Sequence, residues 1–248
     1  MIYLKSKEQI ARMRESGKLL AQCHKELQKL IKPGVSTQTI DHFVENYLKE
    51  HGATPEQKGY NGFPYATCAS VNDVICHGFP NENPLQEGDI VTIDMVVNLN
   101  GALSDSAWSY RVGQVSEQAD KLLTVTEKCL YLGIEQAVVG NRIGDIGHAI
   151  QQYAQGQGFS VVRHFIGHGI GDKMHEDPQV PHYGSPGRGV RLKEGMVITI
   201  EPMLNTGSYQ VKIDKDGWTA RTIDGGLSAQ YEHTIAITED GPVILTQL

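Results

Sequence analysis

One segment of the chain occurs twice in nearly the same form. The sequence reads EGDIVTID at 87–94 and EGMVITIE at 194–201, an offset of 107 residues. Each copy is an apolar run that ends in a carboxylate, Asp94 in the first and Glu201 in the second. A carboxylate at the end of a buried strand costs free energy unless another group pairs with it or binds it. The repetition predicts two similar halves, each of which contributes one such carboxylate.

Two predicted helices precede the repeated strand in each half. Segments 6–31 and 36–52 have the apolar spacing of amphipathic helices, with Ser6 as the first N-cap, and so do segments 116–140 and 145–158. Five residues of the first half recur in frame at an offset of 106: Gly34, Ile40, His42, Tyr47 and Gly52 correspond to Gly140, Ile146, His148, Tyr153 and Gly158. The period is too long for a solenoid, so the repeat indicates a duplicated half.

The duplication predicts an α/β (α+β) fold in which two ααββ halves pack about a pseudo-twofold axis. Their strands would form a curved, mainly antiparallel sheet with helices covering one face. Asp94 and Glu201 would then meet near the axis. No low-complexity linker separates the halves, so we expect residues 1–248 to form a single domain, with the repeat at about 6–112 and 116–238.

Composition argues against several classes of protein, although it leaves room for a local basic patch. A net charge of −7 does not favour a general role on nucleic acid or on a membrane surface. The first 16 residues contain no apolar signal segment, and no apolar run approaches the roughly 18 residues of a membrane span. The four cysteines form no CxxC pair, and 40% apolar residues suffice for an ordinary core without disulfides. These features favour a reducing cytoplasm.

The dipeptide Asn100-Gly101 predicts a two-residue hairpin turn directly after the first repeated strand. Such a turn pairs Leu99 with Ala102, which places Asp94 and Asp105 on the same face of the hairpin, two positions apart on the diagonal. Side chains in this relation lie roughly 7–8 Å apart. Two carboxylates at this separation repel each other, and they persist when a cation lies between them or when they share a proton.

The second half contains matching chemistry. His168 lies between glycines in FIGHGIG, where the neighbouring backbone can approach closely, and Glu232 lies in the alternating strand QYEHTIAI. The candidate ligands are Asp94, Asp105, His168, Glu201 and Glu232. Their four carboxylates balance the charge of two divalent cations, as a dinuclear site on a sheet requires.

Each of these residues also has an ordinary structural interpretation. A histidine in a glycine-rich turn is more often hydrogen-bonded than metal-bound. A strand-end aspartate is usually a cap or a turn former, and a glutamate in an edge strand is usually solvated. The occurrence of the candidates in a duplicated frame, and not any single residue, favours the metal site.

The motifs of the chain resemble those of type I methionine aminopeptidases, in combination and in order, over nearly the whole length. They are CASVNDVICHGFP, GDIVTIDMVV, SDSAWSY, FIGHGIG, HEDPQVPHY, GMVITIEPM and SAQYEHTIAIT. The resemblance implies the pita-bread fold, a duplicated half folded about a pseudo-twofold axis. The two strands that end in carboxylates would then hold opposite sides of a metal pair.

The resemblance also implies a role for each candidate residue. The ligands of two divalent ions would be Asp94, Asp105, His168, Glu201 and Glu232, with Asp94 and Glu232 bridging both ions. Glu201 would also accept a proton from the attacking water. The histidines at the scissile peptide would be His77 and His175, and the pocket for the methionine side chain would be lined by Tyr60, Phe63, Cys68 and Trp218. An apolar and aromatic lining suits a thioether.

The chain departs from the family pattern at two positions of this pocket. Met174 precedes His175 where an aromatic residue is expected, and Phe63 stands where tyrosine is common. Near Asp105 the run SDSAW replaces the usual sequence, but the aspartate itself is present. These departures concern the tolerance for different substrates, because a flexible Met174 would widen the entrance.

The function implied by the resemblance is removal of the N-terminal methionine from nascent proteins with a small second residue. Water activated by the metal ions would attack the first peptide bond. An oxygen-rich set with one imidazole suits Mn, Fe or Co, with Zn as a further candidate. The implied substrates are N-terminal segments of nascent chains near the ribosome in the cytoplasm, and the expected state is a monomer.

Three alternatives are weighed against this function. Proline-specific aminopeptidases and prolidases share the fold but carry a large extra N-terminal domain, whereas the first repeat begins here within ten residues of Met1. Type II methionine aminopeptidases carry a long insertion between the second histidine and the next glutamate, whereas only 25 residues separate His175 from Glu201 here. A non-catalytic pita-bread binding protein would lack ligands that this chain retains.

Overall fold

The computed structural model describes residues 1–248, the whole chain. Its four α-helices, which confirm the four predicted ones, form two consecutive pairs: α1 (Lys7–Leu30), α2 (Thr37–Glu50), α3 (Glu117–Glu135) and α4 (Ile143–Gly156), with a 3₁₀ turn, η1, at Tyr60–Gly62. Helix α3 ends at Glu135 instead of at 140 because residues 136–140 form the turn into α4, with Gly140 at a φ of 95°. None of these helices has the length and apolar character needed to cross a membrane.

Serine side chains begin three of the four helices. The Ser6 hydroxyl accepts a hydrogen bond from the backbone N–H of Gln9, and the Gln9 side chain accepts one from the backbone N–H of Ser6. Ser36 and Ser116 each accept a backbone N–H in the first turns of α2 and α3. These caps satisfy donors that have no partner within the helix, and the predicted N-cap at Ser6 is confirmed.

The strands pair antiparallel throughout. Those of the first half are β1 (Ala53–Pro55), β2 (Cys68–Val71), β3 (Val74–Cys76), β4 (Ile90–Leu99) and β5 (Ala102–Arg111). Those of the second half are β6 (Ser160–Val161), β7 (Gly167–Gly169), β8 (Glu176–Val180), β9 (Val197–Ile200), β10 (Met203–Asn205), β11 (Val211–Ile213), β12 (Ala220–Thr222), β13 (Ser228–Gln230), β14 (His233–Thr238) and β15 (Gly241–Ile244). Their hydrogen-bonded ladders form four groups, β1-β4-β2 with β5 on β4, β13-β10-β6, β11-β12-β3 and β15-β14-β9-β7-β8.

The hairpin of β4 and β5 has the predicted register. Leu99 pairs with Ala102, and Asp94 pairs with Ala107. Asn100 and Gly101 both have positive φ angles, 53° and 81°, as a tight two-residue turn between twisted strands requires. The turn chemistry visible in the sequence therefore fixes which face of the hairpin carries its carboxylates.

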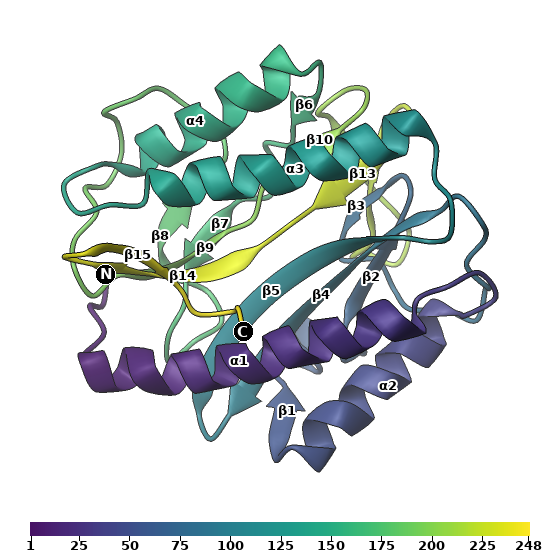
Figure 1. Ribbon diagram of the computed structural model, residues 1–248, viewed down its shortest axis with the longest axis horizontal. Coiled ribbons are helices and arrows are strands. Elements are labelled where there is room, and N and C mark those ends of the chain that lie inside the picture. Colours follow the sequence, from purple (N-terminus) through teal and green to yellow (C-terminus); the bar gives the residue numbers. More distant parts are fainter.

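The two halves meet where β5 runs beside the chain that leads from β13 into β14 (Figure 1). The backbone N–H of Glu232 donates to the carbonyl of Ala107 at 2.8 Å, and the Ser106 hydroxyl donates to the carbonyl of Glu232 at 2.8 Å. The Thr234 hydroxyl accepts from the N–H of Asp105 and donates to its carbonyl. These hydroxyl contacts join the two halves at a seam where no regular ladder continues, and they bring Asp105 and Glu232 side by side.

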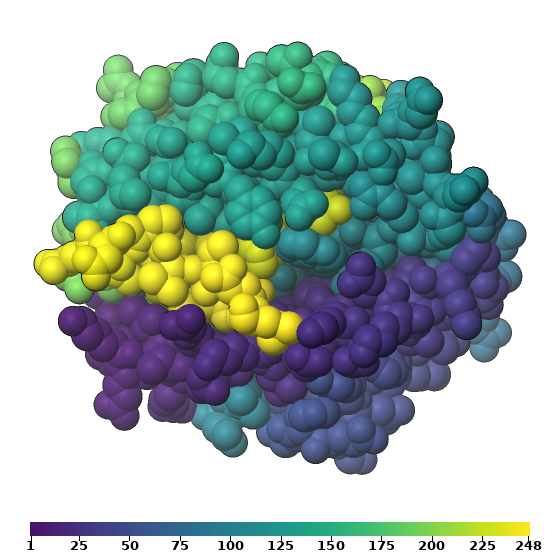
Figure 2. Space-filling model, in the orientation of Figure 1, coloured from purple at the N-terminus to yellow at the C-terminus, as the bar shows by residue number.

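The apolar cores follow the duplication. Helices α1 and α2 cover the strands of the first half, and α3 and α4 cover those of the second, all on one side of the strands (Figure 1). A smaller cluster includes Met13, Val96, Val197 and Leu245, and so packs the two halves together. In the space-filling view the C-terminal segment lies along the line where the halves meet (Figure 2).

Replacement of Gly17 by alanine tests this packing. Gly17 is a buried residue of α1, and a Cβ at this position would collide with the backbone carbonyl of Leu245. Alanine normally stabilises a helix relative to glycine, but the collision should reverse the sign, and we expect Gly17→Ala to lower the free energy of unfolding by about 1–3 kcal/mol. The measurement is urea unfolding.

The matched control is Gly156→Ala in α4, where nothing lies within 4 Å of the added methyl group. It should be neutral or stabilising by up to about 1 kcal/mol. Equal effects of the two substitutions would show that the C-terminal segment does not pack tightly on α1.

Candidate metal centre and active site

All the site residues predicted from the sequence line one cavity of about 180 Å³. The candidate ligands come from five places in the chain: Asp94 in β4, Asp105 in β5, His168 in β7, Glu201 directly after β9, and Glu232 between β13 and β14. The remaining predicted residues, Tyr60, Phe63, Cys68, His77, His175 and Trp218, complete one side and the mouth of the same cavity. The structure thus brings the predicted set together, while the chemical role of each member stays a prediction.

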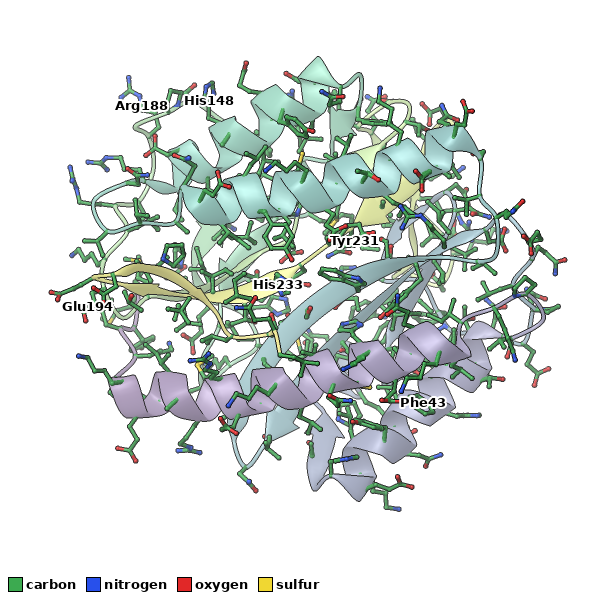
Figure 3. All side chains as sticks on the ribbon, in the orientation of Figure 1. Phe43, His148, Arg188, Glu194, Tyr231 and His233 are labelled. Atoms are coloured by element: carbon green, nitrogen blue, oxygen red, sulfur yellow. The ribbon has the colours of Figure 1, made fainter.

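Glu232 was expected within a strand but lies in the short break between β13 and β14, and it faces the cavity. The rings of Tyr231 and His233 lie on the helix-covered side, where both contact the indole of Trp108 (Figure 3). Neighbouring residues of an extended chain point to opposite sides, so Glu232 points away from the helices and into the site.

The acidic and imidazole groups are close together. His168 Nε2 lies 3.7 Å from Asp105 Oδ2 and 3.7 Å from Glu201 Oε1. Ligand atoms of Asp105, His168 and Glu232 all lie within 4.8 Å of one another. Of the carboxylates, Asp105, Glu201 and Glu232 are buried and Asp94 is partly exposed. Several ionisable groups therefore share one small, largely dehydrated space.

Burial raises the pKa of every carboxylate in the cluster. It raises the pKa of Asp94 from 3.8 to about 7. The pKa of Asp105 lies well above its usual value because of burial first, and then because of repulsion by Asp94 and Glu201. Burial followed by repulsion from the neighbouring carboxylates also raises the pKa values of Glu201 and Glu232 well above the usual range. Without a counter-charge, the four carboxylates resist full ionisation. A cation placed among them would favour the ionised form.

His168 is held as a neutral imidazole. Burial lowers its pKa from 6.5 to about 4. Its Nδ1 lies 3.0 Å from the carbonyl of Gly169, to which it donates, so Nε2 is left as the acceptor that faces the carboxylates. The glycines on either side allow this placement, because a Cβ at Gly167 or Gly169 would collide with the backbone of Thr199 or Asp177.

The hydrogen bonding of the cluster is incomplete in a way that fits a metal. Asp105 Oδ1 and Glu232 Oε1 are buried and have no hydrogen-bond partner. Buried acceptors without partners are rare, and each calls for a compensating group. Carboxylate oxygens together with a neutral imidazole nitrogen are the donors that divalent metal ions take. The residues present therefore fit a metal centre.

Two supporting residues were missed by the sequence analysis. The Thr199 hydroxyl donates to Glu201 Oε1 at 2.9 Å and accepts from the backbone N–H of His168 at 2.9 Å. The backbone N–H of Glu201 donates to Nε2 of the buried His182 at 3.0 Å. Thr199 could have been found, because it lies two positions before Glu201 in EGMVITIE and so shares its strand face. His182 lies in the motif HEDPQVPHY, but nothing in that motif indicates its contact with Glu201.

Aromatic rings form the other end of the cavity. The ring of Phe63 lies edge-on to that of Trp218, with 5.1 Å between the ring centres. The ring of His77 lies edge-on to that of Phe165, also with 5.1 Å between the ring centres. Cys68 pairs with Asp94 across β2 and β4, so the apolar end directly adjoins the carboxylates. The sequence analysis did not include Phe165 among the lining residues.

His77 has a strained backbone, with a φ of 56°. A residue with a Cβ seldom adopts this conformation, which costs of order 1 kcal/mol or more and occurs chiefly where a functional site requires it. Burial lowers the pKa of His77 from 6.5 to about 4, so its imidazole is neutral. The strain and the neutral ring both favour a role at the substrate.

His175 lies at the mouth of the cavity. Its Nδ1 is 3.1 Å from the Tyr60 hydroxyl, and its ring centre is 4.3 Å from that of His168. The preceding Met174 is 6% exposed, belongs to the apolar cluster between the halves and also lines the inner cavity. Its expected effect on the width of the entrance stays a prediction.

An outer cavity of about 720 Å³ adjoins the mouth and shares Ile166, His168 and His175 with the inner one. Its remaining lining includes Met1, Tyr3 and Asp177. The outer cavity is large enough to receive several residues of a peptide whose end occupies the inner cavity.

Comparisons with known proteins agree with this geometry. The model of metallopeptidase family M24 matches residues 11–239. The curated protein "Methionine aminopeptidase 1" of Bacillus subtilis (strain 168) is 51% identical over 248 residues, covering 100% of both chains. The crystal structure of methionine aminopeptidase from Rickettsia prowazekii superposes with a TM-score of 0.98 at 44% identity, over 99% of this chain and 100% of the other. The prolidase from Pyrococcus furiosus shares the fold alone, with a TM-score of 0.81 at 24% identity, and this chain covers 65% of its length.

The chain therefore belongs to metallopeptidase family M24. Within this family it groups with the methionine aminopeptidases, whose name its full-length relatives carry. The resemblance inferred from the motifs is confirmed, and so is the α/β pita-bread fold with duplicated halves.

The raised pKa of Asp94 predicts a pH-dependent stability of the metal-free protein. Between pH 3.8 and about 7 the folded state retains a proton that the unfolded state has lost. The stabilisation that this proton provides is complete below pH 3.8 and is lost as the pH rises through about 7.

Asp94→Asn removes this group, so the variant should gain stability relative to the natural protein as the pH rises across the window, by an amount on the order of 2–4 kcal/mol. Loss of the Asp94 charge also relieves the repulsion that raises the pKa values of Asp105, Glu201 and Glu232, which adds to the gain in the same direction. The measurement is urea unfolding in the presence of a chelator at several pH values. A stability difference that stays constant with pH would contradict the raised pKa.

Proposed function

We propose that this chain removes methionine from the N-terminus of peptides and nascent proteins by metal-dependent hydrolysis of the first peptide bond, with a preference for a small second residue. The observation that carries the proposal is the convergence of four carboxylates and the neutral His168 beside an aromatic pocket. A cavity of about 180 Å³ admits the end of a chain and no folded segment. The curated relatives bear the matching name.

The carboxylates and His168 would hold two divalent cations. The residues that would hold them are Asp94, Asp105, His168, Glu201 and Glu232. Two divalent ions balance four ionised carboxylates, and they supply partners for the buried oxygens that lack one. The oxygen-rich set with one imidazole suits Mn, Fe or Co, with Zn as a further candidate. When bound, such ions lower the pKa of water and polarise the substrate carbonyl.

Glu201 is proposed to move the proton. It takes the proton from the attacking water and passes it to the amine that leaves. The hydrogen bond from the Thr199 hydroxyl orients the Glu201 carboxylate for this transfer.

The two remaining histidines are proposed to act on the peptide bond. His175 donates a hydrogen bond to the carbonyl oxygen as negative charge develops there. His77 bonds the nitrogen side of the same bond. Burial lowers the pKa of both, so each ring is neutral and carries one N–H that can donate.

The methionine side chain is placed at the aromatic end. The proposed lining is Tyr60, Phe63, Cys68 and Trp218, and all four reach the cavity. A flexible thioether packs well against aromatic edges, such as those of the Phe63 and Trp218 pair.

Wider aspects of the function are also proposed. The chain acts on nascent polypeptides near the ribosome, as a monomer in the cytoplasm, and residues 1–248 form one catalytic domain with its repeat at about 6–112 and 116–238. The four cysteines are all free thiols, which supports a reducing compartment. The candidate residues come from one chain and from both halves of the repeat, which supports a single-domain monomer.

Removal of divalent metal should abolish activity. We expect a chelator to stop hydrolysis of Met-Ala-Ser, and Mn, Fe or Co to restore it, because the four carboxylates repel one another without cations. Asp94→Asn and Glu232→Gln should lose bound metal, measured by elemental analysis, together with rate. The matched control is Asp120→Asn, an exposed carboxylate of α3 that pairs with Arg111 and should retain both. Full turnover in metal-free buffer, or retained metal in a variant that fails to fold, would contradict the proposed centre.

The preference for substrates should follow the pocket. In a panel of Met-X-Ser peptides, kcat/KM should be high for X of Gly, Ala or Ser and low for Leu or Lys, which the small cavity excludes. At the first position norleucine should remain a fair substrate, because an apolar pocket distinguishes a small change of shape by only about 1–3 kcal/mol. Alanine should be poor there. If Ala-Pro peptides were cleaved faster than every Met peptide, a prolidase-like function would replace the one proposed.

A further inference from the structure

The first six residues form an arm along the outer cavity before α1 begins. The backbone N–H of Lys5 donates to the carbonyl of Gly195 at 2.6 Å, which fixes the arm to the start of the repeated strand. The amino group of Met1 pairs with Asp177, and the Lys5 ammonium pairs with Glu176 at 2.5 Å. Both acidic partners follow His175 directly in the sequence, so the arm binds the segment that carries this histidine.

The Lys5–Glu176 pair is buried, unlike the other lysine–glutamate pairs of the chain. Its side chains are 6% and 8% exposed, whereas those of Lys58 and Glu45 are 41% and 38% exposed. Burial of both charges carries a large desolvation penalty and is weak evidence for a role in stability alone. A pair of this kind also fixes the relative position of the two segments that it joins.

Glu176 uses both of its carboxylate oxygens. Oε1 accepts from the backbone N–H of Lys173 at 3.1 Å and so closes the turn that contains His175, while Oε2 accepts from Lys5. Gly171, at the start of the same turn, contacts the Lys5 side chain so closely that a Cβ there would collide with it. The Lys5 ammonium therefore pairs with the carboxylate that closes the turn, and the Lys5 side chain packs against the first residue of the turn.

The His175 side chain has one hydrogen bond of its own, to the Tyr60 hydroxyl at 3.1 Å. Tyr60 belongs to the short η1 turn and is itself 39% exposed, so it offers limited support. The buried Met174 next to His175 belongs to the same apolar cluster as Met13 of α1. The His175 backbone is thus linked to the N-terminal part of the chain through this cluster and through the Lys5–Glu176 pair.

We propose that Lys5 is a positioning residue for His175, and that the N-terminal arm is part of the active-site structure. The proposal rests on the proposed function, in which His175 donates to the substrate carbonyl. Lys5 contacts neither substrate nor ligand residues; it acts through Glu176 and the turn. Displacement of a catalytic group by about 1 Å costs on the order of 100-fold in rate, so loss of the Lys5 contact should be visible in kcat.

The test is a cycle of variants in the metal-loaded full-length enzyme with Met-Ala-Ser as substrate. Lys5→Met, His175→Ala and the double variant are compared for kcat, KM and bound metal, below the thermal midpoint of each. Lys5→Met should lower kcat by roughly 10- to 100-fold, with KM and bound metal nearly unchanged. In the His175→Ala background the same substitution should change kcat less than about twofold. The matched control is Lys7→Met, an exposed lysine at the start of α1, which should leave kcat unchanged.

Each outcome separates the two proposals. If His175→Ala alone retains full kcat, the role of His175 in the proposed function is wrong. Suppose instead that His175→Ala loses rate, while Lys5→Met lowers kcat equally in the natural protein and in the His175→Ala variant, or lowers it in neither. The role of His175 then stands, and Lys5 does not act through it. If Lys5→Met fails to fold because Glu176 is left unpaired, Lys5→Met/Glu176→Gln removes both charges and takes its place in the same comparison.

Discussion

Four carboxylates lie close together in one cavity where the two halves of the chain meet, and the rest of the structure must offset the cost of burying them. Each would be hydrated and ionised in water. Here burial raises the pKa of all four, and mutual repulsion adds to that effect for Asp105, Glu201 and Glu232. The free energy that holds them together must come from elsewhere, namely from the apolar cores beneath the two pairs of helices and, in a metallopeptidase, from divalent cations.

The way the halves join follows from the same constraint. The two halves share one regular ladder, between β3 and β12, whereas along β5 the hydroxyl groups of Ser106, Ser109 and Thr234 bridge them. These short side chains form hydrogen bonds with backbone groups of the opposite half beside the acidic side chains. The duplicated strands thus deliver their carboxylates to a common point, and hydroxyl groups beside that point maintain the spacing.

The two ends of the cavity around the cluster differ. Aromatic rings close one end, and the outer cavity lies at the other, so a substrate has one orientation available. His77 and His175 flank this path, and each is held in a different way. His77 lies in a strained backbone conformation, while His175 lies in a turn that the N-terminal arm supports. The geometry of the site therefore depends on segments far apart in the sequence, the backbone at His77 and the N-terminal arm.

The sequence by itself determined the duplication, the four helices, the register of the hairpin and the five candidate ligands. It did so because these features rest on local rules: the spacing of apolar residues, the Asn-Gly turn, and the alternation of strand faces that puts Asp94 and Asp105 together. The two further histidines, the pocket residues and the chemical roles came from the family resemblance. The roles stay predictions, since identical carboxylates can bind a metal or share a proton. Only the tertiary structure decided the division of the strands into four groups, the burial of Met174, the support of Glu201 by His182, and the Lys5–Glu176 pair. Each of these features joins residues far apart in sequence or depends on how two layers pack. A local pattern of side chains does not predict such packing.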